Sequence, residues 1–321
     1  MRRAVLILVT LVATAAAGFQ AIADQDNCTL KGLASLEITT STDGWALVPV
    51  QLGSTTLEFA VNPAQMFSML TESVAREQQL KFVTIEGFYE RTAFLGMTKF
   101  IAMSPIRLGH ADVQGTNFAI IPRQIGNDPR VAGILGLDVL SAFDVLLDFA
   151  HSKVVLISRK HCSLQGVLQG PSVPMKITNW FRIPVQVNGR NVEAEISGIS
   201  ASTYVNPHSA MENFGVEVHA PAFADEAAAV QPLMPHGRIT PAIKLGINTI
   251  TVDGIAISNP ITRVYDCEDA PSNYRITCDS LPPLELGISE LQKVKAYLDF
   301  QDGLFFAMPA DASPAAGASP E

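Results

Sequence analysis

The feature that most constrains the fold of this 321-residue chain is a repeat within its own sequence. Residues 48–52 read VPVQL, and residues 183–187, 135 positions later, read IPVQV. The next apolar stretches, 57–61 (LEFAV) and 192–196 (VEAEI), keep the same spacing without a gap. A constant spacing over consecutive stretches is typical of a duplicated structural unit. We therefore expect the chain to contain two copies of one unit.

The repeat continues to the end of each unit at a larger spacing. Residues 135–137 (LGL) match residues 286–288 (LGI), now 151 positions apart, so the second copy contains an insertion. The two units span about 45–160 and about 180–308.

Each unit begins with a pattern typical of a β-hairpin. Apolar residues alternate on both sides of Gly53-Ser54-Thr55 in the first unit and of Asn188-Gly189 in the second, and Asn-Gly is a strong type I′ turn signal. A short helix is expected after each hairpin, over 71–79 and 207–214. The 22 Gly and 20 Pro residues favour many short strands joined by tight turns. We predict an all-β fold with few short helices, in which two lobes are related by an internal pseudo-two-fold axis.

Composition and charge exclude some classes of protein. Hydrophobic residues make up 48% of the chain and charged residues 17%, which is too apolar for an intrinsically disordered protein. The formal net charge is −9, whereas a nucleic-acid-binding surface needs an excess of basic residues. We therefore expect no nucleic-acid partner.

The N-terminal segment predicts export. Arg2 and Arg3 precede an apolar run over 4–17, and small residues end at Ala23 before a polar stretch. This order is typical of a secretory signal peptide, so we expect residues 1–23 to be removed and the mature protein to be secreted or periplasmic. The alternative is a membrane anchor, but 14 apolar residues are fewer than the ~20 that span a bilayer. No later segment is apolar for long enough to be a transmembrane segment.

Four cysteines remain after removal of the signal peptide. An even number in an oxidising compartment favours disulfides over metal ligands or a thiol nucleophile; the alternative is four free, buried thiols. Cys267 and Cys278 flank a short polar segment, whereas Cys28 and Cys162 enclose the first unit. We predict the pairs Cys28–Cys162 and Cys267–Cys278, the first of which would hold the mature N-terminus in place.

The end of the first unit carries a resemblance to a known family. Residues 133–140 read GILGLDVL and are followed by FDV at 143–145, LDF at 147–149 and a KVVL strand. This order resembles the C-terminal half of a lobe of the retropepsin-like and pepsin-like aspartic proteases. The resemblance covers nearly all of the first unit and, more faintly, the second.

The resemblance implies a two-lobed, acid-protease-like β-barrel fold, with the lobes facing each other across a substrate cleft under hairpin flaps. In this chain it implies lobes at 24–162 and 163–308, with flaps over 83–97 and 231–242. One chain with both lobes is an internal pseudo-dimer, so a monomer is expected. The tail at 309–321, rich in Ala, Pro and Ser, should be disordered because it has little apolar surface to bury.

The resemblance also indicates where catalysis would occur, and the residues needed for it are absent there. In the family each lobe carries Asp-Thr-Gly or Asp-Ser-Gly after the first hairpin, and the two carboxyl groups share one proton. These positions hold Asn62-Pro63-Ala64 and Ser197-Gly198-Ile199, and neither family tripeptide occurs anywhere in the chain. We therefore predict that no residue performs the family's catalysis.

Other reactive residues are interpreted as structural. Asp138, Asp148 and Asp299 lie in the Leu-Gly and Leu-Asp-Phe segments, where turn caps and strand ends are expected. A serine nucleophile such as Ser197 or Ser200, with His208 as its base, would need the Gly-x-Ser-x-Gly turn of serine hydrolases, which the chain lacks. The six His residues show no ligand spacing, so we expect neither a metal site nor a cofactor.

Binding can persist where catalysis is lost, because a cleft and its flaps can pair their main chain with an extended peptide. Large side chains of the first flap are candidates for lining such a groove, and these are Phe88, Tyr89, Phe94 and Met97. The alternative is that they pack in the core.

Three functions are consistent with these observations. The leading hypothesis is an exported, aspartic-protease-like but catalytically inactive protein that binds an extended polypeptide or another ligand between its lobes. The second is an active endopeptidase or hydrolase with an unrecognised catalytic group. The third is a structural or assembly protein of the cell envelope.

Overall fold

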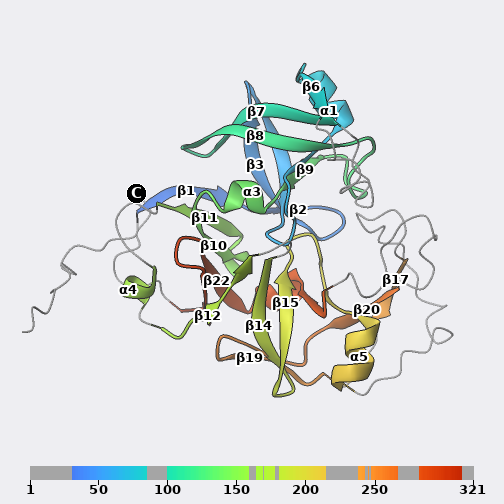
Figure 1. The fold of residues 1–321 in the computed structure, drawn as a ribbon, viewed down its shortest axis with the longest axis vertical. Coiled ribbons are helices and arrows are strands. Elements are labelled where there is room, and N and C mark those ends of the chain that lie inside the picture. Colours follow the sequence, from blue (N-terminus) through green and yellow to red (C-terminus); the bar gives the residue numbers. More distant parts are fainter. Residues whose placement is uncertain are drawn as a thin grey trace, which may run out of the picture.

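The protein was analysed as a computed structural model. The structure describes residues 31–84, 100–158, 164–168, 170–177, 181–214, 238–242, 245, 247–266 and 282–312. Most of them form β-strands, and the few helices are short. Figure 1 shows the two halves of the chain as two lobes, with a third sheet beside them. The predicted all-β, two-lobed architecture is confirmed.

The first lobe is built around an eight-stranded sheet. Its strand order is β2-β3-β4-β9-β5-β8-β7-β6, and β3 also pairs with β7, so the sheet curves back on itself. The strands are β2 (Thr39–Thr40), β3 (Ala46–Leu52), β4 (Thr55–Val61), β5 (Met69–Thr71), β6 (Phe82–Thr84), β7 (Phe100–Leu108), β8 (Ala111–Ile121) and β9 (Val131–Leu135).

The second lobe repeats this arrangement in a nine-stranded sheet. Its strand order is β17-β20-β16-β21-β15-β14-β18-β19, and β13 pairs with β14 beside this path. The strands are β13 (Lys176–Ile177), β14 (Phe181–Val187), β15 (Arg190–Ile196), β16 (Thr203–Val205), β17 (Arg238–Ala242), β18 (Thr249–Val252), β19 (Ile255–Ser258), β20 (Thr262–Asp266) and β21 (Leu284–Leu286).

The two lobes share the same strand pairings. The predicted hairpins are β3–β4 and β14–β15, and the last strand of each hairpin pairs in parallel with β9 or β21. Asn188 and Gly189 have φ values of 48° and 81°, as a type I′ turn requires at both central positions. The Asn-Gly signal therefore predicted this turn for the right physical reason.

A six-stranded sheet joins the two halves. Three strands come from the first half, namely β1 (Gly32–Glu37), β10 (Asp144–Asp148) and β11 (Lys153–Ile157), and three from the second, namely β12 (Val173–Pro174), β22 (Val294–Asp299) and β23 (Leu304–Pro309). The halves meet where β10 pairs with β22, with Leu146 opposite Tyr297. These two residues are equivalent in the repeat, 151 positions apart. The pseudo-two-fold axis therefore passes between them.

Two pairs of short helices lie at equivalent places in the repeat, one after each hairpin and one after each Leu-Gly turn. The helices are α1 (Glu72–Glu77), α3 (Leu137–Leu140), α4 (Leu164–Leu168), α5 (Pro207–Phe214) and α6 (Ile288–Leu291), and a 3-10 turn covers η2 (Phe149–His151). The expected helix over 71–79 is α1, whose N-cap Thr71 accepts a hydrogen bond from the backbone N–H of Val74. The expected helix over 207–214 is α5.

Strand alternation divides each lobe sheet into a core face and an outer face. In β14, Phe181, Ile183 and Val185 are buried, whereas Arg182 and Pro184 between them are less buried. The buried face joins one apolar cluster that extends from the first lobe through the shared sheet into the second. The outer faces are therefore the surfaces on which the lobes can differ without disturbing this common core.

Several predictions fall outside the described residues. These are the signal peptide at 1–23, the four cysteines, the first-flap residues Phe88, Tyr89, Phe94 and Met97, and most of the second flap and of the tail. Pro309, the first residue of the predicted tail, ends β23. Within the described part of the chain, none of the helices has the length and apolar character to cross a bilayer.

Candidate functional site

The loops that follow the two hairpins have the same backbone anchoring. β4 is followed by Asn62, whose N–H donates to the carbonyl of Leu135 at 3.0 Å. β15 is followed by Ser197, whose N–H donates to the carbonyl of Leu286, also at 3.0 Å. Leu135 and Leu286 are equivalent in the repeat. The positions at which the resemblance placed the two aspartates are thus structurally equivalent.

These two loops meet each other between the lobes. A Cβ atom on Gly198 would lie only 2.0 Å from the carbonyl oxygen of Val61, so the second-lobe loop rests directly on the first. The backbone N–H of Ala46 donates to the carbonyl of Gly198 at 2.9 Å. The structure therefore brings Asn62-Pro63-Ala64 and Ser197-Gly198-Ile199 together.

Neither loop presents a carboxyl group at the expected position. The Asn62 residue is 4% exposed, and no donor among the described residues reaches its Oδ1 atom. Ser197 is fully buried, and its hydroxyl donates to Oγ of Ser200 at 3.2 Å. Two neutral side chains therefore occupy the two equivalent positions.

The Leu-Gly turns that support the loops use equivalent hydroxyl groups. The N–H of Gly136 donates to Oγ of Ser68 at 2.9 Å, and the N–H of Gly287 donates to Oγ1 of Thr203 at 3.2 Å. Ser68 in turn donates to Asp138 at 2.7 Å. This agrees with a structural role for Asp138.

In the second lobe the supporting acid is Glu290, which sequence reasoning missed. Its fully buried carboxylate accepts hydrogen bonds from Thr203 and from the N–H of Ile261. By the spacing of the repeat, the equivalent of Asp138 is Ser289, so the acid of the second lobe lies one position later.

Asp148 and Asp299 also have structural surroundings. Asp148 accepts from the N–H of His151 at 3.2 Å, and Asp299 accepts from the N–H of Asp302 at 2.9 Å. Both bonds close the turn after a central strand of the shared sheet. Burial raises the pKa of Asp299, and its Oδ2 atom has no donor among the described residues.

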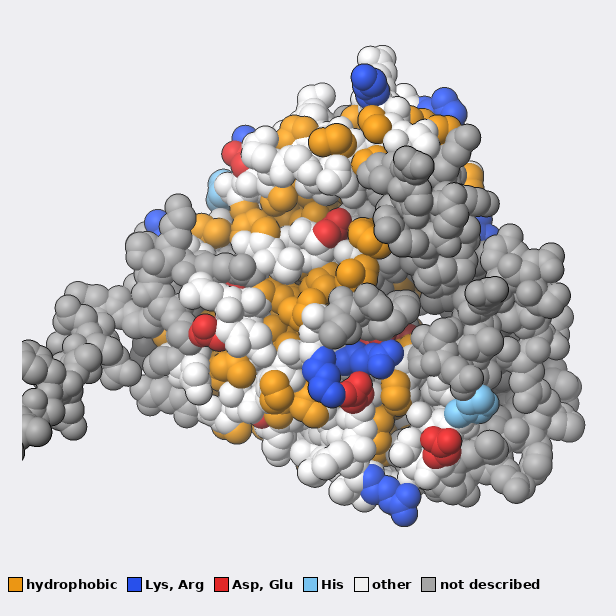
Figure 2. Space-filling view, viewed as in Figure 1, with side chains coloured by type: hydrophobic (Ala, Val, Ile, Leu, Met, Phe, Trp, Pro, Cys, Tyr) orange, Lys and Arg blue, Asp and Glu red, His pale blue; other side chains and the backbone are white. Residues whose placement is uncertain are grey.

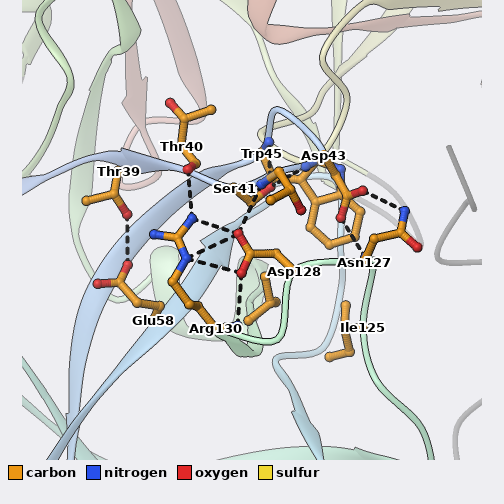
Figure 3. A network of polar contacts seen from close by, with 12 residues as sticks. Thr39, Thr40, Ser41, Asp43, Trp45, Glu58, Ile125, Asn127, Asp128 and Arg130 are labelled. Carbon is orange, nitrogen blue, oxygen red and sulfur yellow. Dashed lines mark hydrogen bonds and ion pairs between the residues drawn. The ribbon is translucent and has the colours of Figure 1, made fainter.

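A polar network braces the first-lobe loop that approaches the second lobe (Figure 3). Asp128 accepts from the guanidinium of Arg130 at 2.6 Å and from the N–H of Thr42 at 3.0 Å. Asp43 accepts from the side-chain amide of Asn127 at 2.7 Å. Hydrogen bonds from Arg130 lower the pKa of Asp128 to about 2, so its carboxylate is ionised at neutral pH.

The braced loop makes the contact with the second lobe. A Cβ on Gly44 would lie 2.9 Å from the Cβ of Ala201, and the φ of Gly44 is +79°, which favours glycine. Two residues later, Ala46 binds Gly198. The network therefore holds the first lobe in register with the loop that carries Ser197.

A row of polar side chains crosses the outer face of the second-lobe sheet, next to these loops. Cross-strand pairing places Glu195 opposite Glu285, Glu285 beside Tyr204, and Tyr204 opposite Arg263. At the other end, Nε of Arg182 lies 3.3 Å from the Glu195 carboxylate. We call Arg182, Glu195, Glu285, Tyr204 and Arg263 the polar row.

The equivalent row of the first lobe is entirely apolar. Register pairs Leu47 with Ala60, Ala60 with Ile134, Ile134 with Met69, and Met69 with Ala119. These five residues belong to a buried cluster separate from the common core, and partly buried Ile199 of the second lobe packs against it. Equivalent positions of the two lobes thus have opposite chemistry.

The two glutamates of the polar row perturb each other. Burial, followed by the charge of Glu285, raises the pKa of Glu195 to about 8 despite the nearby Arg182. Burial also raises the pKa of Glu285, while hydroxyl hydrogen bonds from Ser197 and Ser200 oppose that rise. At neutral pH Glu195 is therefore largely protonated.

Sequence reasoning missed both glutamates, although a signal was present. Each is an acidic residue between buried apolar residues of a strand, in VEAEI and LEL. Among the described residues, no group of three His, Cys, Asp or Glu side chains could hold a metal ion.

Comparison with known proteins bears on the fold alone. No protein-family model and no curated protein sequence matches the chain. The crystal structure of conglutin gamma, a basic 7S globulin from lupine seeds, matches 88% of this chain and 96% of its own, with a TM-score of 0.50 and 13% identity. Basic 7S globulin from soybean matches 90% of this chain and 100% of its own, with a TM-score of 0.49 and 12% identity. The chain has a two-lobed, acid-protease-like β fold with an internal pseudo-two-fold repeat.

Proposed function

We propose that this chain is an exported, catalytically inactive relative of the aspartic proteases that binds an extended polypeptide between its lobes. The observation that carries the proposal is the meeting of the two hairpin loops with Asn62 and Ser197 in place of two carboxyl groups. The binding site is the same inter-lobe region, and the export part rests on the N-terminal sequence.

The chemistry of the two positions supports inactivity. Aspartic catalysis needs one ionised carboxylate to activate water and one protonated carboxyl to protonate the substrate carbonyl. An amide and a hydroxyl supply neither, and loss of a cooperative catalytic unit costs on the order of 10⁶-fold in rate. In addition, no hydrogen-bond donor among the described residues contacts Oδ1 of buried Asn62.

The arrangement of the lobes supports binding. The sheets of both lobes flank the loops, with buried apolar residues beside the loop of the first lobe and polar residues beside the loop of the second. An extended peptide can satisfy main-chain hydrogen bonds along strand edges without any catalytic group.

The test uses the mature protein with casein and a degenerate peptide pool. We expect no pepstatin-sensitive cleavage from pH 3 to pH 7, together with saturable binding of the pool measured by fluorescence anisotropy. Cleavage abolished by pepstatin would overturn the inactivity, and absence of binding to any peptide would overturn the binding role.

A second candidate, a hydrolase with a relocated acidic pair, is favoured by one observation. The carboxylate of Glu285 accepts a hydrogen bond from Ser200, and Oγ of Ser200 accepts one from Ser197, the residue at the second position where an aspartate is missing. If the wild type cleaves peptides and Glu285→Gln abolishes cleavage, this candidate replaces the first.

A further inference from the structure

We propose that Glu195 and Glu285 form a proton-dependent latch, which holds the second-lobe loop 197–201 against the first lobe and releases it when the pair loses its proton. The inference concerns the conformation of the protein and does not rest on the proposed polypeptide binding. It is carried by the placement of the two acids, by the groups around them, and by a hydrogen-bonded path from them to the contact between the lobes.

The two acids lie at positions where the fold itself requires no charge. The equivalent residues of the first lobe are Ala60 and Ile134, which pair in the same parallel register and are fully buried. This strand pair can therefore be built from apolar residues alone, without the cost of removing charged groups from water. Glu195 and Glu285 are thus a property of the second lobe and not a requirement of its architecture.

The pair is too close and too buried to carry two negative charges without strain. Glu195 and Glu285 are directly opposite each other in parallel strands, which lie about 4.8 Å apart, so their side chains are on the same face. Glu195 is only 4% exposed. Burial and the charge of Glu285 accordingly raise the pKa of Glu195 to about 8, and the pair retains one proton at neutral pH.

The cations on one side of the pair do not neutralise a second charge. Arg182 divides its guanidinium between Glu195 at 3.3 Å and Glu193 at 3.6 Å, and Glu193 also forms an ion pair with Lys176. Figure 2 shows Lys or Arg side chains beside an acidic side chain at the surface over β14 and β15. Most of this positive charge is therefore already matched by Glu193.

The groups on the other side of the pair do not neutralise it either. Arg263 donates from Nε to Oγ of Ser202 at 3.4 Å, and within the described part of the chain no ion pair reaches Glu285. Burial raises the pKa of Tyr204, which lies beside Glu285, to about 12, so this phenol stays neutral below pH 10. Ionisation of Glu195 therefore adds a charge that its surroundings leave unbalanced.

A hydrogen-bonded path joins the pair to the loop. The Glu285 carboxylate accepts from the hydroxyl of Ser200, and Oγ of Ser200 accepts from Ser197 at 3.2 Å. The carbonyl of Ser200 also accepts from the N–H of Ile288 at 2.8 Å. Because Arg182 holds Glu195, repulsion between the two charges displaces Glu285, the acid that is bonded to the loop.

The same loop makes the contact with the first lobe. The carbonyl of Gly198 accepts from the N–H of Ala46 at 2.9 Å, and partly buried Ile199 packs against the apolar cluster of the first lobe. On the first-lobe side, the network around Asp128 holds the chain in place (Figure 3). Loss of the bond between Ser200 and Glu285 therefore loosens the contact from the second-lobe side.

The direction of the pH effect follows from proton linkage. Glu195 has an ordinary pKa of 4.5 once it is exposed to water, but about 8 in the latched form, so the latched form binds the proton more tightly. The ratio of released to latched molecules should rise by about tenfold for each pH unit between pH 5 and pH 8, and level off above pH 8. Acidification therefore closes the latch.

The experiment measures hydrogen exchange of the Ala46 amide by NMR at pH 5.5 and pH 7.5, expressed as a protection factor that corrects for the intrinsic exchange rate. The variant Glu195→Gln keeps the shape of the protonated acid but cannot ionise. The control Glu77→Gln removes an exposed carboxylate of α1. We expect the protection factor to fall by about 100-fold in the wild type and in Glu77→Gln, and by at most a tenth of that in Glu195→Gln.

Three outcomes would overturn the latch. The first is a wild-type protection factor that is the same at both pH values, and the second is an equal fall in Glu195→Gln. The third is an Ala46 amide that exchanges no faster than the slowest amides of β10, because the contact would then open only when the whole protein unfolds. If Glu195→Gln does not fold by circular dichroism, Glu285→Gln takes its place, since it also leaves a single ionisable acid, with the same expected result.

Discussion

Replacing Gly198 by alanine tests the contact between the two halves directly. The new Cβ would lie 2.0 Å from the Val61 carbonyl oxygen, whereas ordinary contacts begin at 3.4 Å, so one backbone must move by about 1.4 Å. Overpacking of this kind costs about 1–3 kcal/mol, and loss of the Ala46–Gly198 hydrogen bond costs about 1 kcal/mol more. We expect Gly198→Ala to lower the free energy of unfolding by about 2–4 kcal/mol.

Thermal unfolding monitored by circular dichroism and by tryptophan fluorescence measures this loss. Trp45 is 2% exposed and precedes Ala46, so its emission reports on the contact itself. At about 2–4 °C for each kcal/mol, the midpoint should fall by roughly 5–15 °C. The matched control is Gly170→Ala, whose Cβ would lie 3.7 Å from the nearest atom. Equal midpoints for the two variants would show that the loops do not meet as described.

Four further predictions concern other parts of the molecule. Thr203→Val removes the hydroxyl that bridges Gly287 and buried Glu290, and should cost about 1–3 kcal/mol of unfolding free energy in urea titrations. Asp128 has a pKa of about 2 in the folded protein and 3.8 as a free group, so its ionised form stabilises the fold above pH 4 and this stabilisation is lost as the pH falls toward 2. The variant Asp128→Asn should therefore show a smaller change in unfolding free energy between pH 4 and pH 2. The difference from the wild type should be at most about 1 kcal/mol, because Arg130 is half exposed. N-terminal sequencing of exported protein should begin at Asp24, and peptide mapping without reductant should find these pairs: Cys28–Cys162 and Cys267–Cys278.

The repeat predicted the lobes because equivalent positions are under equivalent backbone constraints. The glycine of each Leu-Gly turn shows why. A Cβ on Gly136 would lie 2.6 Å from the Gln65 carbonyl oxygen, and one on Gly287 would lie 2.1 Å from that of Ser202. A backbone segment occupies the same space in both lobes, so only glycine fits, and the sequence records the constraint twice.

The shared sheet and the polar row could not be predicted in the same way. The strands β10 and β22 lie about 150 residues apart, and no local pattern specifies which distant strand pairs with which. Glu195 and Glu285 become neighbours only through a parallel pairing across 90 positions. In the strand pattern alone, each of these glutamates is simply an outward polar residue between apolar ones.

The symmetric register of the shared sheet makes each half complementary to itself. Val145 pairs with Leu298, and Leu147 pairs with Ala296. In the repeat Val145 is equivalent to Ala296 and Leu147 to Leu298, so the second pair is the first with the two halves exchanged. A first half released from the second would therefore present an edge, β10, that a further copy of β10 could match residue for residue about Leu146. The central joint of the tandem chain has the geometry of a homodimer interface, and fusion of two such subunits would have required no new pairing.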